Sequence, residues 1–208
     1  MSKLERFLKT GHPDQVIGHL RRMRDPKRIA TALEHEKIFP RSAAAARLTE
    51  IDPAGFRAYF LREIQRSEDF RRRKILHIIA NMGPRNAEFT DDIAELGLKH
   101  KVADTRNYAL LALGKIGPPA AKYIPEIANR GLYGPTLTEA VKALERIGDP
   151  AAIPFLKKEI EKDQEPLNFR KKHLPEWEIK EMIFVMRKLM IMKAVGRVKK
   201  FFRFRTSY

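Results

Sequence analysis

The chain has 208 residues, of which 43% are hydrophobic, so it is long enough to bury a core or a short repeat array and is not typical of a disordered protein. It carries 42 Lys and Arg against 26 Asp and Glu, a formal net charge of +16. So large an excess on a short chain indicates a polyanionic partner: nucleic acid, an acidic protein or an anionic membrane surface.

The chain contains no Cys, which excludes disulfides, thiolate metal sites and Cys nucleophiles. Its first residues are charged and do not resemble a secretory signal, so a cytoplasmic location is expected. The longest apolar stretch, 179–195, is interrupted by several Lys, Arg and Glu residues, which are costly in a bilayer. No transmembrane segment is therefore predicted.

Residues 1–42 are predicted to form a divergent N-terminal cap. Asp14 and Asp25, next to Pro13 and Pro26, are plausible helix starts. The terminal unit of a repeat array is expected to be atypical because one of its faces must meet water.

An internal repeat begins after this cap. Four segments can be laid over one another: AAAARLTEIDP, KILHIIANMGP, YALLALGKIGP and EAVKALERIGDP. Their equivalent apolar residues Ile51, Met82, Ile116 and Ile147 lie 31, 34 and 31 positions apart. Apolar residues within each segment follow helical spacing, so each segment is predicted to be an amphipathic helix.

The end of each repeat helix also recurs. Gly83, Gly117 and Gly148 are predicted to take the left-handed position that ends a helix, and a Pro follows each of them closely. A second helix is predicted after each of three stops, starting near Ala54, Ala120 and Ala151. The repeating unit is therefore a helical hairpin.

The residues that carry the repeat resemble a known family. Asp104-Thr105-Arg106, Leu113-Gly114, Ile116-Gly117 and Pro118-Pro119-Ala120-Ala121 are similar to the HEAT-like repeat of the phycobilisome-lyase type. This resemblance, over roughly 43–162, implies an all-α, right-handed α-solenoid spanning 1–168. It implies little about function, because such solenoids serve as scaffolds, nucleic-acid binders, bilin lyases and DNA glycosylases.

Four consecutive cations occupy the start of the second repeat segment. Arg71, Arg72, Arg73 and Lys74 face an unfavourable helix dipole, partly offset by Glu68 and Asp69 upstream. Two interpretations stay open: a solvated helix end, or a polyanion-binding patch continuous with the C-terminal segment.

Charge concentrates in residues 169–208, which hold 12 basic and 3 acidic residues. The pattern over 175–195 is helical, but its apolar residues cover more than one side, and a helix that is apolar nearly all round is expected to be buried. We expect one side, formed by Ile179, Ile183, Met186 and Met190, to pack on the last repeat. The remaining side would then need a partner protein or a second copy of the chain.

Cations alternate with aromatics after Gly196, where a tail is predicted. Lys and Arg can neutralise phosphates and Phe can stack on bases, which suits RNA; the same mixture suits the headgroups of an anionic membrane, as a peripheral contact. The predicted polyanion-binding residues are Arg71, Arg72, Arg73, Lys74, Arg187, Lys188, Lys193, Arg197, Lys199, Lys200, Arg203 and Arg205. The predicted stacking or docking residues are Phe201, Phe202 and Phe204.

Signs of catalysis are scarce. The six His residues show no metal-ligand spacing, and no phosphate-binding loop, dinucleotide fingerprint or nucleophile elbow is present. Trp177 is the sole Trp, whereas the related DNA glycosylases use several aromatics and a carboxylate. Asp104 and Arg106 are expected to make turn and inter-repeat bonds. No catalytic residue, metal or cofactor is predicted.

The sequence therefore predicts a non-catalytic, cytoplasmic HEAT-like binding protein. Its partner is expected to be nucleic acid or a ribonucleoprotein, engaged through a basic surface and the segment 169–208. The alternative is a protein scaffold or accessory subunit of a larger assembly, docked through the same apolar and basic segment.

Overall fold

The computed structural model describes residues 12–65, 68–163 and 174–205 together with Leu4, Arg6 and Leu8, and gives only the backbone of 162–163 and 192–205. Every regular element in this described part is helical, which confirms the predicted all-α class. In chain order the elements are α2 (Pro13–Arg22), α3 (Pro26–Ala30), η1 (Thr31–Glu34), α4 (Ile38–Ile51), α5 (Pro53–Gln65), α6 (Asp69–Met82), η2 (Gly83–Phe89), α7 (Thr90–Asp92), η3 (Ile93–Leu98), α8 (Ala103–Ile116), η4 (Pro118–Tyr123), α9 (Ile124–Gly131), η5 (Gly134–Thr136), α10 (Leu137–Ile147), η6 (Pro150–Ala152), α11 (Ile153–Asp163) and α12 (Glu176–Arg205).

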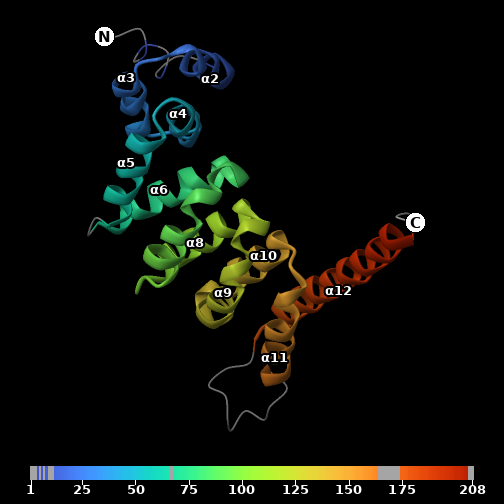
Figure 1. Cartoon of the computed structure of the whole chain (residues 1–208). Helices are drawn as coiled ribbons and strands as arrows, with labels where there is room; N and C mark the ends of the chain where they lie inside the picture. Colours follow the sequence, from blue (N-terminus) through green and yellow to red (C-terminus); the bar gives the residue numbers. More distant parts are fainter. Residues whose placement is uncertain are drawn as a thin grey trace.

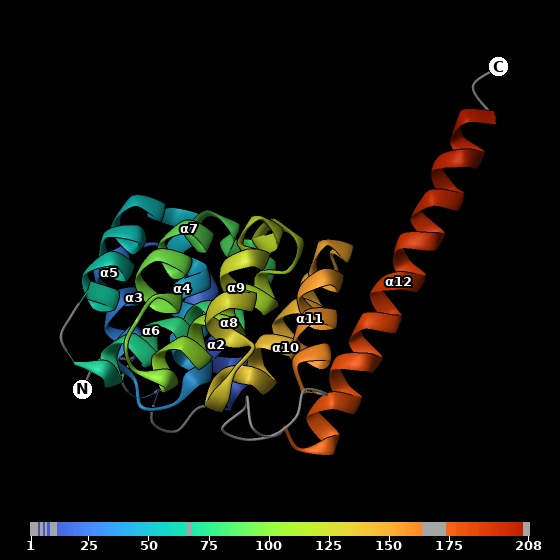
Figure 2. The same cartoon turned by 90° about the horizontal axis from the view of Figure 1, so that it is seen from below.

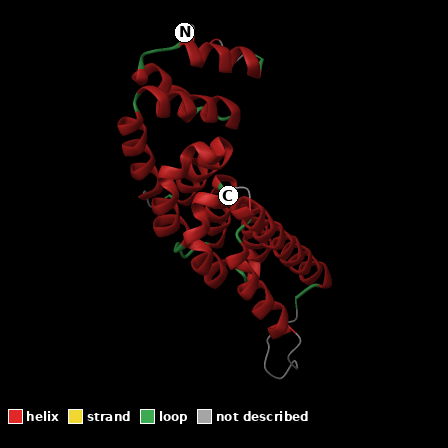
Figure 3. Cartoon of the chain, turned by 45° about the vertical axis from the view of Figure 1, so that its right-hand side comes forward, coloured by secondary structure: helices red, strands yellow, loops and turns green. Residues whose placement is uncertain are grey.

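The helices stack in series as a solenoid. A first row consists of α2, α4, α6, α8 and α10, each packed on the next, and α12 packs on α10 at the end of this row. A second row is formed by α5, by the short elements η2 to η3, by α9 and by α11, one after each first-row helix from α4 on. Figures 1 and 3 show the stack as a curved row running from α2 to α12. The right hand of the superhelix stays a prediction.

The first-row helices end where the repeat predicts. Ile51, Met82, Ile116 and Ile147 are the last residues of α4, α6, α8 and α10. The equivalence drawn from sequence is therefore an equivalence of position in the solenoid.

Glycine ends three of these helices with a positive φ. Gly148 is left-handed, with φ 71° and ψ 14°, as predicted. Gly83 and Gly117 have φ 63° and 80° but ψ near −138°, an extended conformation that is also open almost only to glycine. In each case the glycine N–H bonds back to the carbonyl four residues earlier, as in Gly117 N–H to Leu113 at 3.1 Å.

The core is continuous along the stack. Its N-terminal part is aromatic, with the Phe60 and Phe89 ring centroids 4.7 Å apart and the Phe56 ring edge-on to Phe89 at 5.7 Å. Its C-terminal part consists of Ala, Leu and Ile from α8 to α11. Gly114 permits the close approach of α8 and α10, because a Cβ there would lie 2.8 Å from Ala143 Cα.

The N-terminal cap contains the two predicted helix starts. Asp25 caps α3 by accepting a bond from the Lys27 N–H at 3.0 Å, and Asp14 lies in the first turn of α2. Such caps satisfy backbone donors that have no partner within the helix.

The last helix differs from all the others in length. α12 has 30 residues, whereas α4 to α11 have at most 14. The predicted helix end at Val195 is wrong, because the helix continues through Gly196 to Arg205. A Gly inside a helix costs only about 1 kcal/mol, and no Pro follows that would end the helix. The cations near its C-terminal end also interact favourably with the helix dipole. Figure 2 shows its C-terminal part projecting beyond the packed helices.

Candidate docking surface

One side of α12 packs into the end of the solenoid. Met182, Val185 and Leu189 are completely buried, and α12 contacts both α10 and α11. Met190, expected to belong to this side, is 52% exposed. Ile179 and Met186, expected on the same side, do pack against the core and are partly buried. The sequence therefore identified the edge of the packed side but not its centre, because several sides of this helix are apolar.

Two polar contacts set α12 against α10. Lys188 Nζ lies 2.7 Å from Glu145 Oε1, and Thr138 Oγ1 donates to Glu178 Oε1 at 3.4 Å. Lys188, predicted to bind a polyanion, thus pairs within the chain. The two helices run in the same direction, because the later residue of α12 meets the later residue of α10.

The opposite side of α12 is apolar and uncovered. Trp177, Phe184 and Ile191 are 56%, 57% and 64% exposed. They are seven residues apart, which in a helix is 20° short of two turns, so they form a stripe along one side. We call these three residues the α12 stripe. Large apolar residues aligned on one exposed side are typical of an interaction surface.

Positive charge follows the α12 stripe toward the C-terminus. Around the stripe itself, residues 176–191 hold three acidic and three basic residues, and Lys180 pairs with Glu176 one turn away at 2.7 Å. Among the described residues, Arg187 makes no ion pair. From Arg187 to Tyr208 the chain has eight basic residues and no acidic one, so the positive excess begins at the C-terminal end of the stripe.

A cavity opens on the first row, and Glu139 and Arg146 of α10 are among the residues that line it. The cavity has a volume of about 420 Å³ and lies between α6, α8 and α10. Its charged residues are mostly paired: Arg73 with Asp104 at 3.0 Å, and Glu139 with Lys142 at 3.2 Å. Arg146 makes no ion pair within the described part of the chain. The lining residues are Arg73, Asp104, Asn107, Tyr108, Leu111, Glu139 and Arg146. Among the described residues that line the cavity, Arg146 is therefore the cation without a carboxylate partner, and Tyr108 and Leu111 contribute apolar surface.

The predicted Arg71–Lys74 cluster is ion-paired within the chain. Arg71 bonds Glu68 at 2.9 Å and approaches Glu63 at 3.5 Å, and Arg72 pairs with Asp69 at 2.9 Å. Lys74 pairs with Glu34 of η1 at 2.7 Å. Together with the Arg73–Asp104 pair, these contacts compensate the charge of all four cations and join neighbouring repeats.

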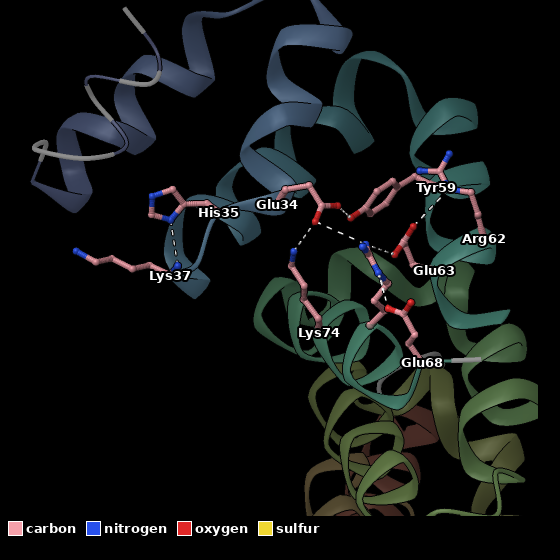
Figure 4. A network of polar contacts seen from close by, with 9 residues as sticks. Glu34, His35, Lys37, Tyr59, Arg62, Glu63, Glu68 and Lys74 are labelled. Carbon is pink, nitrogen blue, oxygen red and sulfur yellow. Dashed lines mark hydrogen bonds and ion pairs between the residues drawn. The ribbon is translucent and has the colours of Figure 1, made fainter. Parts of the chain in front are cut away.

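Figure 4 shows the centre of this network. Glu34 accepts from both Lys74 and the Tyr59 hydroxyl, the latter at 2.8 Å. Burial raises the pKa of the Glu34 carboxyl, but the bonds from Lys74 and Tyr59 outweigh burial and hold that pKa below its usual value. Burial, and then the bond to Glu34, raise the pKa of Tyr59. The network is a clamp between η1, α5 and α6.

Other residues weighed from sequence have structural places. Arg106 donates to the carbonyls of His100 and Lys101 at 3.0 and 2.8 Å, and Asp104 makes the inter-repeat pair with Arg73, as expected. His35 accepts from the Lys37 N–H and does not meet Glu34 in Figure 4. Among the described residues, no cluster of three potential metal ligands occurs, and no helix is long and apolar enough to cross a membrane.

The remaining predicted residues fall where only the backbone is described. The side chains of Lys193, Arg197, Lys199, Lys200, Phe201, Phe202, Arg203, Phe204 and Arg205 lie outside the described residues. Their binding role stays a prediction.

Sequence reasoning missed Arg146 and the α12 stripe. The seven-residue spacing of Trp177, Phe184 and Ile191 was present in the sequence, but other apolar residues lay on every side of the helix. Only the burial of Met182, Val185 and Leu189 separates the stripe from the packed side.

The stack of helical hairpins, with matching helix ends and no strand among the described residues, defines an α-solenoid repeat protein. A family model described as PBS lyase HEAT-like repeat matches residues 137–161, which cover α10 and most of α11. The chain therefore contains a HEAT-like repeat, and its stacked helical hairpins are those of a HEAT-like repeat architecture.

Other comparisons bear on the fold alone. The chain is similar to the crystal structure of an engineered protein, with 14% identity and a TM-score of 0.51 over 91% of this chain and 97% of the other. No curated protein sequence matches it.

Proposed function

We propose that this HEAT-like protein is a non-catalytic scaffold or accessory subunit that holds an acidic macromolecular partner through α12. The observation that carries the proposal is the α12 stripe: three large apolar side chains, each more than half exposed, on the most basic segment of the chain. A partner that covers the stripe removes apolar surface from water, and its acidic groups meet the cations that follow the stripe.

A contrast in charge supports α12 as the binding element. The cluster Arg71–Lys74 is compensated by the chain's own carboxylates. The last 22 residues contain no acidic residue that could compensate their eight cations locally. The division of the chain into a solenoid of 1–168 and a binding segment of 169–208 is part of the proposal, as is a cytoplasmic location.

Affinity purification from the native host tests the proposed function. Full-length protein is compared with a full-length variant in which Lys193, Arg197, Lys199 and Lys200 are changed to Glu. A matched variant changes four exposed cations of the solenoid, Arg85, Lys101, Lys115 and Lys158, to Glu. Loss of a discrete, nuclease-resistant partner from the first variant alone supports the proposal. Equal retention by all three proteins contradicts it.

Nucleic acid or a ribonucleoprotein is a second candidate partner. It is favoured by the number of cations from Arg187 to Tyr208, which suits a phosphate backbone. Binding to phosphates weakens log-linearly as salt rises, because counterions are released, whereas apolar docking changes little. If the partner is lost on nuclease treatment and its binding weakens steeply as salt rises, the partner is nucleic acid and not protein.

A further inference from the structure

We infer that the partner segment is an acidic amphipathic α-helix of another protein, lying along the α12 stripe. This inference rests on the proposed function and specifies its partner. Among the described residues, the stripe is the largest set of exposed apolar side chains that repeats along one helix. Its occupant follows from the spacing, the neighbouring charges and the shape of the stripe.

The spacing favours a helix over an extended chain. At 1.5 Å per residue, Trp177, Phe184 and Ile191 are separated by about 10 Å along α12. A helix lying beside α12 presents apolar residues at the same interval, through its own seven-residue repeat. An extended strand places its same-side residues about 7 Å apart and falls out of step with the stripe.

The charges favour an acidic occupant over a second copy of this chain. Residues 176–205 contain three acidic and nine basic residues, a net charge of +6, so two copies of α12 repel each other overall. Arg187 next to the stripe has no carboxylate partner within the described residues. A carboxylate on the flank of an incoming helix would supply one.

The shape of the stripe favours a protein over nucleic acid. Bases stack on aromatic rings, but Ile191 offers no ring, although it is the most exposed of the three stripe residues. An apolar stripe with charged flanks is instead the pattern of helix-in-groove and coiled-coil recognition.

The chain carries its own reporter for this docking. Trp177 is the only Trp and lies in the stripe, so its fluorescence emission shifts to shorter wavelength when the stripe is covered. The probe is a synthetic helix of three heptads with Leu at positions a and d, Glu at e and g, and Ala elsewhere. Its e and g glutamates oppose pairing of the peptide with itself. A control peptide has the same composition but distributes its Leu around the helix.

Titration of full-length protein is expected to give a saturable blue shift of Trp177 with the amphipathic peptide and a much weaker one with the control. The double variant F184A/I191A retains the reporter and is expected to bind about tenfold more weakly or worse. The double variant F39A/F70A removes two equally exposed Phe residues from α4 and α6 and is expected to bind as the unaltered protein does. The variant R187E is expected to lose affinity as well.

Other outcomes overturn the inference. A shift produced by poly(U) or by phosphatidylglycerol vesicles, but not by the peptide, assigns the stripe to RNA or to a membrane. A shift that depends on protein concentration alone assigns it to a second copy. Equal binding by F184A/I191A, or no shift with the peptide, also contradicts it. In a further outcome, the variant F184A/I191A retains the host partner while the variant with Glu at Lys193, Arg197, Lys199 and Lys200 loses it. That result would support the proposed function and contradict the inference that the partner binds the stripe as a helix.

Discussion

The repeats and the last helix treat the same kinds of residue differently. Between α4 and α11, most large apolar side chains are buried, and the dense cluster Arg71–Lys74 is paired with carboxylates. On α12 one side is buried, whereas Trp177, Phe184 and Ile191 meet solvent, and the cations that follow from Arg187 onward have no acidic residue among them. A repeat helix is covered by its successor. Among the described residues no further helix covers the stripe side of α12, so this side is available for binding.

The comparison is sharpest for two Phe residues. Phe60 is buried against Phe89 in the core, and Phe184 is exposed on α12. Phe60→Ala leaves a cavity and is expected to lower the free energy of unfolding by about 3–5 kcal/mol. Phe184→Ala is expected to change it by less than about 0.5 kcal/mol. Urea denaturation followed by circular dichroism measures both. A similar loss for Phe184→Ala would place that ring in a packed interface.

The next largest effect separates the two sides of α12. Leu189 is completely buried, and its neighbour Met190 is half exposed. Leu189→Ala is expected to cost about 2–4 kcal/mol and Met190→Ala less than about 1 kcal/mol, since only Leu189 leaves a cavity. Thermal unfolding of the two variants gives the order. The reverse order would mean that α12 packs through the side predicted from sequence.

The smallest effect tests the clamp of Figure 4. Glu34→Gln keeps the shape of the side chain but removes the charge that faces Lys74 and Arg71. Because Glu34 is half exposed and screened by solvent, the expected cost near neutral pH is only about 1 kcal/mol.

This cost depends on pH with a defined sign. The pKa of Glu34 lies below its ordinary value of 4.5 in the folded chain, so the carboxylate stabilises the fold fully above that value. As pH falls below 4.5 and through the folded pKa, the difference between Glu34→Gln and the unaltered protein should vanish. Denaturation at a series of pH values checks this. A difference that persists unchanged at the lowest pH would mean that the charge of Glu34 is not what stabilises the clamp.

Much of the repeat was predictable because its signals are local. A Gly that must take a positive φ, a Pro that cannot continue a helix and apolar residues at helical spacing each act within a few residues. The equivalence of Ile51, Met82, Ile116 and Ile147 therefore coincided with the ends of α4, α6, α8 and α10. The ψ of Gly83 and Gly117 was not predictable, because the path of the chain into the second row sets it.

The candidate site was less predictable because its properties are not local. Arg71 to Lys74 form a positive cluster in the sequence, but their partners Glu34, Glu63 and Asp104 come from other helices. The opposite holds for Arg146, which is inconspicuous in the sequence but lines the cavity of α6, α8 and α10 with no ion-pair partner among the described residues.

The sequence by itself determined the class of this protein, the length of its repeat, the ends of its first-row helices and the concentration of its charge. Only the tertiary structure decided which side of α12 is buried and which cations are compensated. Helix formation depends on neighbours three or four residues away, whereas burial and ion pairing depend on which helices stack side by side.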